Sequence, residues 1–396
     1  MRHHRCRNTQ QITASSYRPL SSVGYRIVAD DLIQVTPSLR RIADSLTLLP
    51  GDAIEPRHVA DADMLLVRSI TRVDSELLEN SPVSWVGTAT AGTDHLDLGF
   101  LHAKNIRWAS APGANARAVV EYVLSALAHM NFLPTLLSGE PIGIVGFGHV
   151  GGLLASVVHA LGGSPRVWDP WVDVPASWRG DSFEQVLAAP IVSLHAALHE
   201  RSPWPSVDLI DEPCAVCMQP GQLLINAGRG GLINPPALQT LADRGVQLVM
   251  DTWPGEPDIE ARQLEVVALA TPHIAGYSLT AKKRATDDVI ALLVGGKSMP
   301  RITQVADNPD CGWAIDIADW LKGVLIEHYN PAVDDAALRA VASPNISSED
   351  FERLRRTYVL RGELAGSRLR YRHRVDASMK RAAAALGFEF DNERVQ

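Results

Sequence analysis

A glycine-rich turn between two apolar segments constrains this chain more than any other feature. The apolar run 142–145 ends in three glycines with the spacing G-x-G-x-x-G, at Gly146, Gly148 and Gly151. A second apolar segment with helical spacing, 153–161, leads to a short strand that ends at Asp169. This order of strand, turn, helix, strand and acid is typical of a dinucleotide-binding βαβ unit.

Each glycine of the turn meets a different requirement of such a unit. Gly146 allows the tight turn, Gly148 lets the backbone approach a pyrophosphate, and Gly151 lets the helix pack closely on the strand. The free N–H groups at the helix N-terminus then face the phosphates. Asp169 can accept hydrogen bonds from the adenosine ribose and would repel a 2′-phosphate. The sequence therefore predicts a site for NAD rather than NADP.

Composition indicates a globular protein of two or three domains. The 396 residues are 46% hydrophobic and 21% charged, with a formal net charge of -8. This acidic balance argues against general affinity for nucleic acid or for membrane surfaces. The apolar runs also fall short of the roughly 18 charge-free residues of a membrane span. We therefore expect neither a nucleic-acid nor a membrane partner.

Residues 1–24 differ from the rest of the chain. They contain four arginines, no acid and no continuous apolar stretch, which argues against a secretory signal. The hypotheses that remain are a disordered extension, a transit-like arm and a misassigned start, with translation beginning at Val23.

Cys214 and Cys217 have the C-x-x-C spacing of redox and zinc sites. The sequence contains no second C-x-x-C pair to complete a zinc site. A reduced thiol pair in a cytoplasmic protein is the favoured interpretation, and no metal is expected.

Apolar strands alternate with helical segments on both sides of the glycine-rich unit, which is typical of parallel α/β sheets. Strands are predicted before it at 26–29, 62–68 and 85–90, and after it at 189–195, 222–226, 246–251 and 267–270. The chain then returns to its first part through the loop 271–276 and a helix at 281–294. If the second domain interrupts the first in this way, residues of both domains would line the cleft between them.

We therefore predict an α/β fold in which a Rossmann-type NAD-binding domain is inserted in a smaller, flavodoxin-like α/β substrate domain. The NAD-binding domain is residues 118–272, and the substrate domain is residues 25–117 and 273–299. Residues 300–396 differ in character and form a third, smaller domain, with a polar loop at 307–312 and a helix at 315–326. A basic helix at 351–358 is interpreted as a solvated or interface face rather than a nucleic-acid patch.

Three side chains on loops after strands are of the types that NAD-dependent oxidation of a 2-hydroxy acid requires. Taken singly, Arg229, Glu256 and His273 would be interpreted as a surface salt bridge, a solvated turn acid and a structural histidine. Together, His273 could take a hydroxyl proton while hydride leaves the same carbon. Arg229 could hold the neighbouring carboxylate through two hydrogen bonds and polarise the developing carbonyl oxygen.

Four segments, 146–169, 226–230, 251–257 and 271–276, resemble the signature blocks of the D-isomer-specific 2-hydroxyacid dehydrogenases. The segments 67–73, 86–97 and 271–277 are similar to one branch of that family nearly residue for residue. The resemblance implies NAD-dependent oxidation of 4-phospho-D-erythronate to 2-oxo-3-hydroxy-4-phosphobutanoate, in vitamin B6 (pyridoxal 5′-phosphate) biosynthesis. The segments 334–339 and 351–358 resemble the α+β dimerisation domain of that branch, which implies a homodimer formed through residues 300–396.

The resemblance also implies roles for individual residues. His273 would carry the proton, Glu256 would pair with it, and Arg229 would hold the substrate. The residues that would contact NAD are Gly146, Gly148, Val150, Gly151, Asp169, Ala196, Ala227, Gly228, Arg229, Asp251 and Gly276. The substrate would contact Ser69, Thr90 and Tyr277, with Arg68 beside its phosphate.

Other functions stay open at this point. Ala196 and Ala197 replace a Thr-Pro pair of the family, and loss of the hydroxyl would weaken NAD binding by about 1 kcal/mol. The alternatives are a dehydrogenase of glycerate, 3-phosphoglycerate or lactate, a non-catalytic NAD(H)-binding regulator, and a catalytically decayed enzyme.

Overall fold

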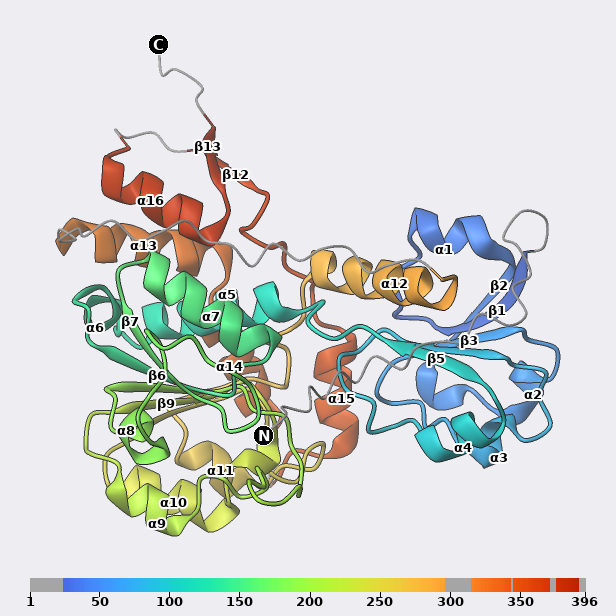
Figure 1. Ribbon diagram of the computed structural model, residues 1–396, viewed down its shortest axis with the longest axis horizontal. Coiled ribbons are helices and arrows are strands. Elements are labelled where there is room, and N and C mark those ends of the chain that lie inside the picture. The colour runs from blue at the N-terminus through green and yellow to red at the C-terminus, as the bar shows by residue number, and fades with distance from the viewer. Residues whose placement is uncertain (1–23, 296–314, 343–344, 371–374, 392–396) are drawn as a thin grey trace, which may run out of the picture.

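Two parallel sheets with helices on their faces form the body of the molecule (Figure 1). This computed structural model describes residues 24–295, 315–342, 345–370 and 375–391. The first sheet has the strand order β2-β1-β3-β4-β5 and the second has the order β11-β10-β9-β8-β6-β7. The predicted α/β class is confirmed. The predicted extension 1–24, except for Gly24, and the predicted loop 307–312 lie outside the described residues.

The first unit is built from short, alternating strands and helices. Its elements are β1 (Tyr25–Asp30), α1 (Pro37–Ile42), β2 (Ala43–Leu49), η1 (Gly51–Ala53), α2 (Pro56–Val59), β3 (Met64–Val67), α3 (Ser75–Leu78), β4 (Trp85–Thr88), α4 (Leu98–Ala103) and β5 (Arg107–Ser110). The strand order 2-1-3-4-5 is that of flavodoxin-like folds, in which ligands bind where the order reverses, between β1 and β3. Arg68 and Asp30 meet at that point, with 3.0 Å between Nε and Oδ1.

Helix α12 (Leu279–Leu293) packs on the first sheet although it follows the second sheet in sequence. Its Val289 and Ile290 share an apolar core with Ile27 and Leu66. Gly87 in β4 permits this contact, because a Cβ there would collide with Val289. The chain therefore crosses between the two units twice, as an interrupted first domain requires.

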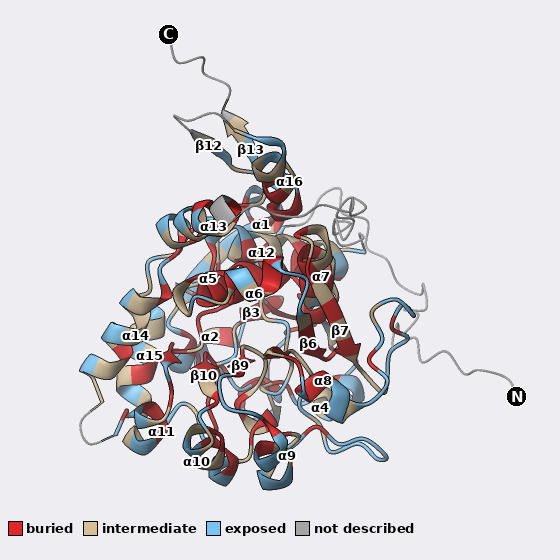
Figure 2. Cartoon of the chain, turned by 90° about the vertical axis from the view of Figure 1, so that its left-hand side faces the viewer, coloured by how far each residue is buried: buried red, intermediate tan, exposed pale blue. Residues whose placement is uncertain are grey.

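The second unit contains the glycine-rich turn. Its elements are α5 (Ala116–His129), α6 (Leu133–Leu137), β6 (Pro141–Val145), α7 (His149–Ala160), β7 (Ser164–Trp168), α8 (Phe183–Leu187), β8 (Ile191–Leu194), α9 (Glu212–Cys217), β9 (Leu223–Asn226), η2 (Gly230–Leu232), α10 (Pro235–Asp243), β10 (Gln247–Met250), α11 (Ala261–Glu265) and β11 (Leu269–Ala270). Strands β8 and β9 are buried along their whole length, as expected where helices cover both faces of a parallel sheet. Figure 2 shows buried residues inside this unit and exposed residues on outer helices such as α9. The strand order reverses between β6 and β8, so the crevice for a ligand lies where Gly146 and His195 follow these strands.

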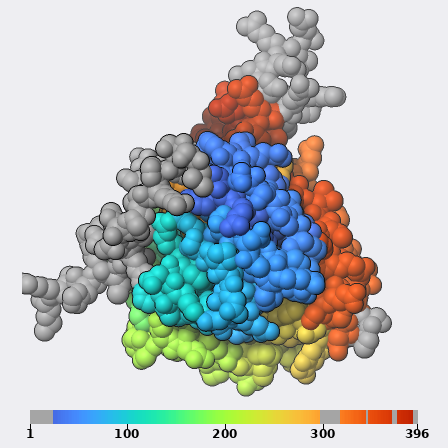
Figure 3. All heavy atoms as spheres, turned by 90° about the vertical axis from the view of Figure 1, so that its right-hand side faces the viewer, coloured from blue at the N-terminus to red at the C-terminus, as the bar shows by residue number. Residues whose placement is uncertain are grey.

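The C-terminal segment contains α13 (Ile315–His328), α14 (Pro331–Ala340), α15 (Ser348–Arg356), β12 (Arg368–Arg370), α16 (Ala377–Leu386) and β13 (Glu389–Asp391). Its apolar side chains join the cores of the second unit. Trp320 and Leu325 pack with Tyr122 of α5, whereas Leu338 and Phe351 pack in the core on the other face of the sheet. Helix α15 lies between the two units (Figure 1). Figure 3 shows C-terminal residues beside the first unit, where Arg356 of α15 pairs with Asp31 at 2.5 Å.

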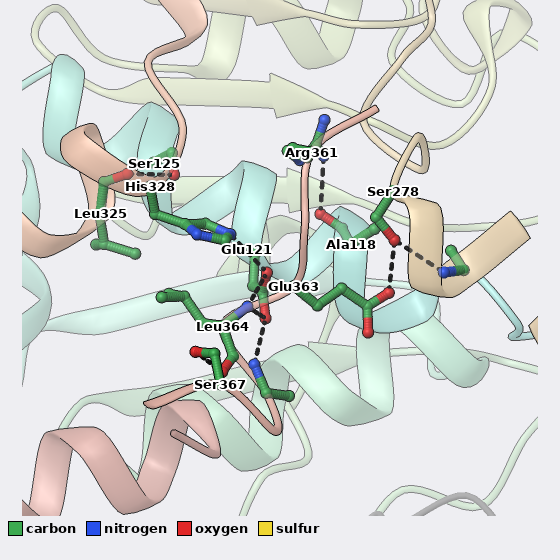
Figure 4. Close-up of polar contacts among 12 residues, drawn as sticks. Ala118, Glu121, Ser125, Ser278, Leu325, His328, Arg361, Glu363, Leu364 and Ser367 are labelled. Carbon is green, nitrogen blue, oxygen red and sulfur yellow. Dashed lines mark hydrogen bonds and ion pairs between the residues drawn. The ribbon is translucent and has the colours of Figure 1, made fainter. Parts of the chain in front are cut away.

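Arg361, which follows α15, is hydrogen-bonded to both segments in which the chain crosses between the two units, here called the outward crossing and the return crossing. Its guanidinium is buried and donates to the carbonyl oxygen of Ala118 at 3.2 Å (Figure 4). It also donates to the carbonyl oxygens of Ile274 at 3.3 Å and Ala275 at 2.5 Å, and to the hydroxyl of Tyr358 at 2.8 Å. Ala118 lies on the outward crossing, and the other two carbonyls lie on the return.

Two buried carboxylates strengthen the same junction. Glu363 accepts hydrogen bonds from the Ser278 hydroxyl at 2.7 Å and from Arg284 at 2.8 Å, both on the return crossing or the helix after it. Glu121 of α5 accepts the backbone N–H of Leu364 at 3.0 Å (Figure 4). The segment around Arg361 is therefore bound to both units by charged groups that are shielded from water.

Candidate active site

The glycine-rich turn has the geometry of a phosphate-binding turn. Gly146 has a φ of +96°, and a Cβ on it would lie 2.6 Å from the backbone nitrogen of Ala196. A Cβ on Gly151 would collide with the carbonyl oxygen of Gly146. Gly148, in contrast, has open space where its Cβ would be, so its backbone is accessible to a ligand. Helix α7 begins directly after Gly148, which leaves its first N–H groups facing that space.

Asp169 lies at the carboxyl end of β7 and is bonded to this turn. Its Oδ2 accepts the N–H of Phe147 at 2.8 Å, and its Oδ1 accepts the N–H groups of Trp171 at 2.8 Å and Val172 at 3.1 Å. The carboxylate opens on a cavity of about 400 Å³ whose lining includes Trp168, Asp169, Trp171, Asp173 and Arg179. The turn and the acid fit the pyrophosphate and the ribose of NAD.

The other residues predicted to contact NAD lie along the same crevice, with one exception. Ala196, Ala227 and Gly228 follow β8 and β9 and are partly exposed, and Val150 is half-buried in the first turn of α7. Gly276 is partly exposed on the return crossing. Asp251 is the exception, because its side chain is buried.

Asp251 supports the loop that carries His273. Its Oδ1 accepts the Thr271 hydroxyl at 2.7 Å and the N–H of Ile274 at 2.8 Å, and its Oδ2 accepts the N–H of Ala275 at 3.0 Å. Burial raises the pKa of this carboxyl, against the opposing charge of His273 and these hydrogen bonds. Asp251 therefore shapes the return loop, and its contact with NAD stays a prediction.

Exchange of Gly151 for alanine tests the cofactor turn. The new methyl group has no room between α7 and the Gly146 carbonyl, so the turn must open, and we expect NAD affinity to fall by at least about tenfold, or about 1.4 kcal/mol. Gly152→Ala is the matched control, because its Cβ would meet only the Phe147 ring at 3.7 Å. Calorimetric titration with NAD measures both variants. Equal affinities would contradict this function of Gly151.

His273 and Glu256 form a hydrogen-bonded pair at the crevice. The distance from His273 Nδ1 to Glu256 Oε1 is 2.7 Å, and about a third of the His273 side chain is exposed, at 31%. His273 has a φ of +55°, and its N–H donates to the Asp251 carbonyl oxygen at 2.8 Å. With Nδ1 engaged by the carboxylate, Nε2 is the ring nitrogen left for a substrate.

Glu256 is held in its ionised form. Its Oε2 accepts the N–H of Trp253 at 3.0 Å. Burial alone would raise the pKa of Glu256, but the charge and hydrogen bond of His273, the Trp253 N–H and the charge of Arg355 outweigh burial and lower it. An ionised Glu256 requires a proton on His273 Nδ1, and in the neutral imidazole with that proton Nε2 is an acceptor.

Arg229 faces the first unit from the loop after β9. Its NH1 donates to the carbonyl oxygen of Gly228 at 2.9 Å, and its NH2 would lie 3.0 Å from a Cβ on Gly92. Within the described ranges it makes no ion pair with an acid, so its guanidinium keeps donors for a carboxylate ligand.

The predicted substrate residues come from both units. Ser69 is exposed directly after Arg68, and the Thr90 hydroxyl donates to the carbonyl oxygen of Gly92 at 2.9 Å. Thr90 therefore lies in the same loop as the glycine that Arg229 approaches. The structure thus brings the ends of β3 and β4 to the crevice, together with the loop after β9.

Two cations that sequence reasoning missed lie over the ring of Tyr277. Lys282 Nζ is 4.2 Å and Arg355 Cζ is 5.7 Å from its centroid. One signal for Arg355 was present in the sequence: it follows the buried Phe351 by four residues, so both share one face of α15. The side chain of Arg355 is only 12% exposed, so of the two interpretations of the arginines in 351–358, a solvated face or an interface face, the solvated face does not hold for Arg355.

Three further features concern the reactivity of the Cys214 thiol, metal binding and membrane-spanning helices. Burial raises the pKa of the Cys214 thiol to about 11, which disfavours the reactive thiolate. Over the described ranges, no group of three His, Cys, Asp or Glu side chains could hold a metal ion. The helices of the same ranges are too short or too polar to cross a membrane.

Comparisons with known proteins agree with this geometry. The family model described as "D-isomer specific 2-hydroxyacid dehydrogenase, NAD binding domain" matches residues 116–275. The chain is 37% identical over 383 residues to an erythronate-4-phosphate dehydrogenase from Pseudomonas entomophila, covering 92% of this chain and 98% of that relative.

Solved structures show the same fold. A protein from Thermus thermophilus is 21% identical with a TM-score of 0.59, and the match covers 69% of this chain and 98% of that one. An NAD-dependent formate dehydrogenase from Staphylococcus aureus, in complex with NAD, is also 21% identical, with a TM-score of 0.52 and coverage of 67% and 93%.

Proposed function

Because the chain belongs to the D-isomer-specific 2-hydroxyacid dehydrogenase family, we propose that it oxidises 4-phospho-D-erythronate at C2 to 2-oxo-3-hydroxy-4-phosphobutanoate. The protein is an NAD-dependent oxidoreductase, and the proposal specifies its substrate. The observation that carries the proposal is the His273–Glu256 pair at 2.7 Å, in a chain that matches the named relative over nearly its whole length. We place the reaction in vitamin B6 biosynthesis, in the cytoplasm.

The residues of the chain divide the chemistry between them. Bound NAD supplies the acceptor for the hydride that leaves C2. His273 Nε2 accepts the proton of the C2 hydroxyl, and Glu256 stabilises the positive charge that then forms on the imidazole. Arg229 holds the C1 carboxylate and polarises the developing oxygen on C2.

Residues that make no contact with the reacting atoms keep this arrangement in place. Asp251 fixes the backbone of the return loop through the N–H groups of Ile274 and Ala275. Trp253 donates its backbone N–H to Glu256, and its indole N–H to the Thr271 carbonyl oxygen at 2.8 Å. Both contacts hold the base in one orientation, which a proton transfer requires.

A substrate panel tests the proposed function. Purified protein with NAD, and in parallel with a 2-oxo acid acceptor, is given 4-phospho-D-erythronate, D-erythronate, D-glycerate, 3-phosphoglycerate and D-lactate. We expect the highest kcat/KM for 4-phospho-D-erythronate, because these acids share the hydride chemistry and differ only in their pocket contacts. Absence of oxo product from that acid, in protein that binds NAD normally, would contradict the proposal. A higher kcat/KM for another acid of the panel would indicate that the protein is a different dehydrogenase of the family.

We further propose that the protein is a homodimer formed through residues 300–396. Two apolar side chains of this segment, Val333 and Val359, are 65% and 87% exposed, more than the other large apolar side chains that the structure describes. A dimer interface that covered both side chains would remove their apolar surface from water.

A further inference from the structure

Three cations gather beside the proposed catalytic pair. Lys282 of α12 and Arg355 of α15 both lie over the Tyr277 ring, at 4.2 Å and 5.7 Å from its centroid. Arg68, at the end of β3, acts electrostatically on Lys282, and Arg355 acts on Glu256, the partner of His273. Lys282 and Arg355 thus meet over one ring although they come from α12 and from the C-terminal segment, and Arg68 of the first unit is near enough to act on the charge of Lys282.

Arg355 is buried with part of its hydrogen-bonding capacity unused. Its NH1 donates to Glu352 at 2.5 Å, whereas its Nε is shielded from water and has no partner. A buried donor without a partner costs about 1–3 kcal/mol, so such groups call for an explanation. A ligand that accepts hydrogen bonds and carries negative charge would provide one.

Among the described residues, Lys282 is the cation of the cluster that forms no ion pair with an acid. Asp30 holds Arg68 through Nε and Glu352 holds Arg355, but Lys282 has no acid within hydrogen-bonding distance among the described residues. Burial, and then the charges of Arg68 and Arg355, lower the pKa of Lys282 to about 8, against the opposing charge of Asp30. The surroundings of Lys282 therefore disfavour its charged form when no ligand is bound. A bound anion would favour that charged form.

We propose that Lys282 and Arg355, together with Arg68, form the subsite for the terminal phosphate of the substrate, with Tyr277 as its floor. This inference rests on the proposed function, because it names the part of the pocket that selects a phosphorylated acid. A phosphate monoester carries a charge between about -1.5 and -2 near neutral pH and three acceptor oxygens, as for phosphorylated side chains. Arg355 makes the C-terminal segment part of the substrate pocket of its own chain.

Substitution of the two newly assigned cations tests the subsite. In Lys282→Met and Arg355→Met, a long side chain is kept and the charge is removed. For each variant, kcat/KM is measured with 4-phospho-D-erythronate and with D-erythronate. We expect the ratio of the two values to fall at least about tenfold, or about 1.4 kcal/mol, with most of the change in KM for the phosphorylated acid.

Two neighbouring residues provide matched controls. Lys283→Met removes an exposed lysine from the same helix as Lys282, and Arg353→Met removes an exposed arginine from the same helix as Arg355. Both should leave the ratio unchanged. NAD affinity and the midpoint of urea unfolding show whether each variant is folded. A loss of equal size with both acids in Arg355→Met would mean that Arg355 acts through Glu256, and would overturn its place in the subsite.

Binding of inorganic phosphate separates this inference from the proposed function. Phosphate should bind the parent protein, measured by calorimetry, and bind Lys282→Met and Arg355→Met at least about tenfold more weakly. If the parent does not oxidise 4-phospho-D-erythronate but phosphate binding depends on the two residues, the proposed function fails and the subsite stands. If the parent oxidises that acid and neither its KM nor phosphate binding responds to the substitutions, the subsite is overturned and the function stands.

Discussion

Exchange of His273 for asparagine lowers kcat of the proposed oxidation by about 10²- to 10⁴-fold, the range that loss of a general base produces. Asparagine is the suitable replacement because His273 has a φ of +55°, a left-handed conformation that asparagine adopts more readily than most residues. The variant therefore removes the imidazole while the return loop keeps its shape. Steady-state kinetics at saturating NAD measure kcat, and titration with NAD confirms an intact cofactor site.

Two further variants make this result specific. Glu256→Gln keeps a hydrogen-bond acceptor for His273 Nδ1 but loses the negative charge, so kcat should fall by less than in His273→Asn. His102→Asn, at an exposed histidine of α4, should leave kcat unchanged. A kcat of His273→Asn equal to that of the parent enzyme would show that another group carries the proton. A parent without turnover, in which the exchange is silent, would favour a catalytically decayed enzyme.

Exchange of Arg361 for methionine lowers the free energy of unfolding by about 3 kcal/mol or more. The arginine supplies the hydrogen bonds of three carbonyl oxygens at the two crossings, those of Ala118, Ile274 and Ala275. Methionine fills a similar volume but donates none of them. The Ala275 carbonyl oxygen then loses its partner, at a cost of about 1–3 kcal/mol, whereas the Ile274 carbonyl oxygen keeps the N–H of Tyr277 at 2.8 Å. Urea unfolding, followed by circular dichroism, measures the difference.

Arg368→Met is the matched control, because it makes the same substitution at an exposed arginine of the same segment. Arg368 lies a few residues further on, pairs with Glu389 at 3.5 Å and is 73% exposed, so its loss should cost less than about 1 kcal/mol. If Arg361→Met and Arg368→Met unfold at the same urea concentration, the contacts of Arg361 with the crossings contribute nothing to stability.

Helices and strands were predicted correctly where the pattern that indicates them lies within one short segment of the sequence. The strand before Gly146 and the helix after Gly148 follow from apolar spacing, and the structure confirms both. Strand β2, Ala43–Leu49, went unpredicted because it lies at the edge of its sheet and carries polar residues that are partly exposed. Edge strands lack the continuous apolar run of buried parallel strands, so their pattern is weak.

The side chains around the substrate were harder to predict because their partners are distant in sequence. His273 and Glu256 are 17 residues apart, and each lies on a loop after a strand, so their meeting could be inferred from the fold. Lys282 and Arg355 lie on helices whose relative placement depends on the packing of the C-terminal segment. Composition alone offered no basis for distinguishing the arginines of α15 by their burial. The structure shows that Arg355 is largely buried and that Arg353 is exposed.

The common core of α5 and α13 also has a consequence for incomplete polypeptides. Tyr122 of α5 is fully buried, and its ring lies 6.0 Å from that of Tyr329, just after α13. A chain released by the ribosome before Ile315 would expose this apolar face to water, and such surfaces promote aggregation and degradation. The second unit would therefore lack part of its apolar cover until the last helices have been synthesised and packed.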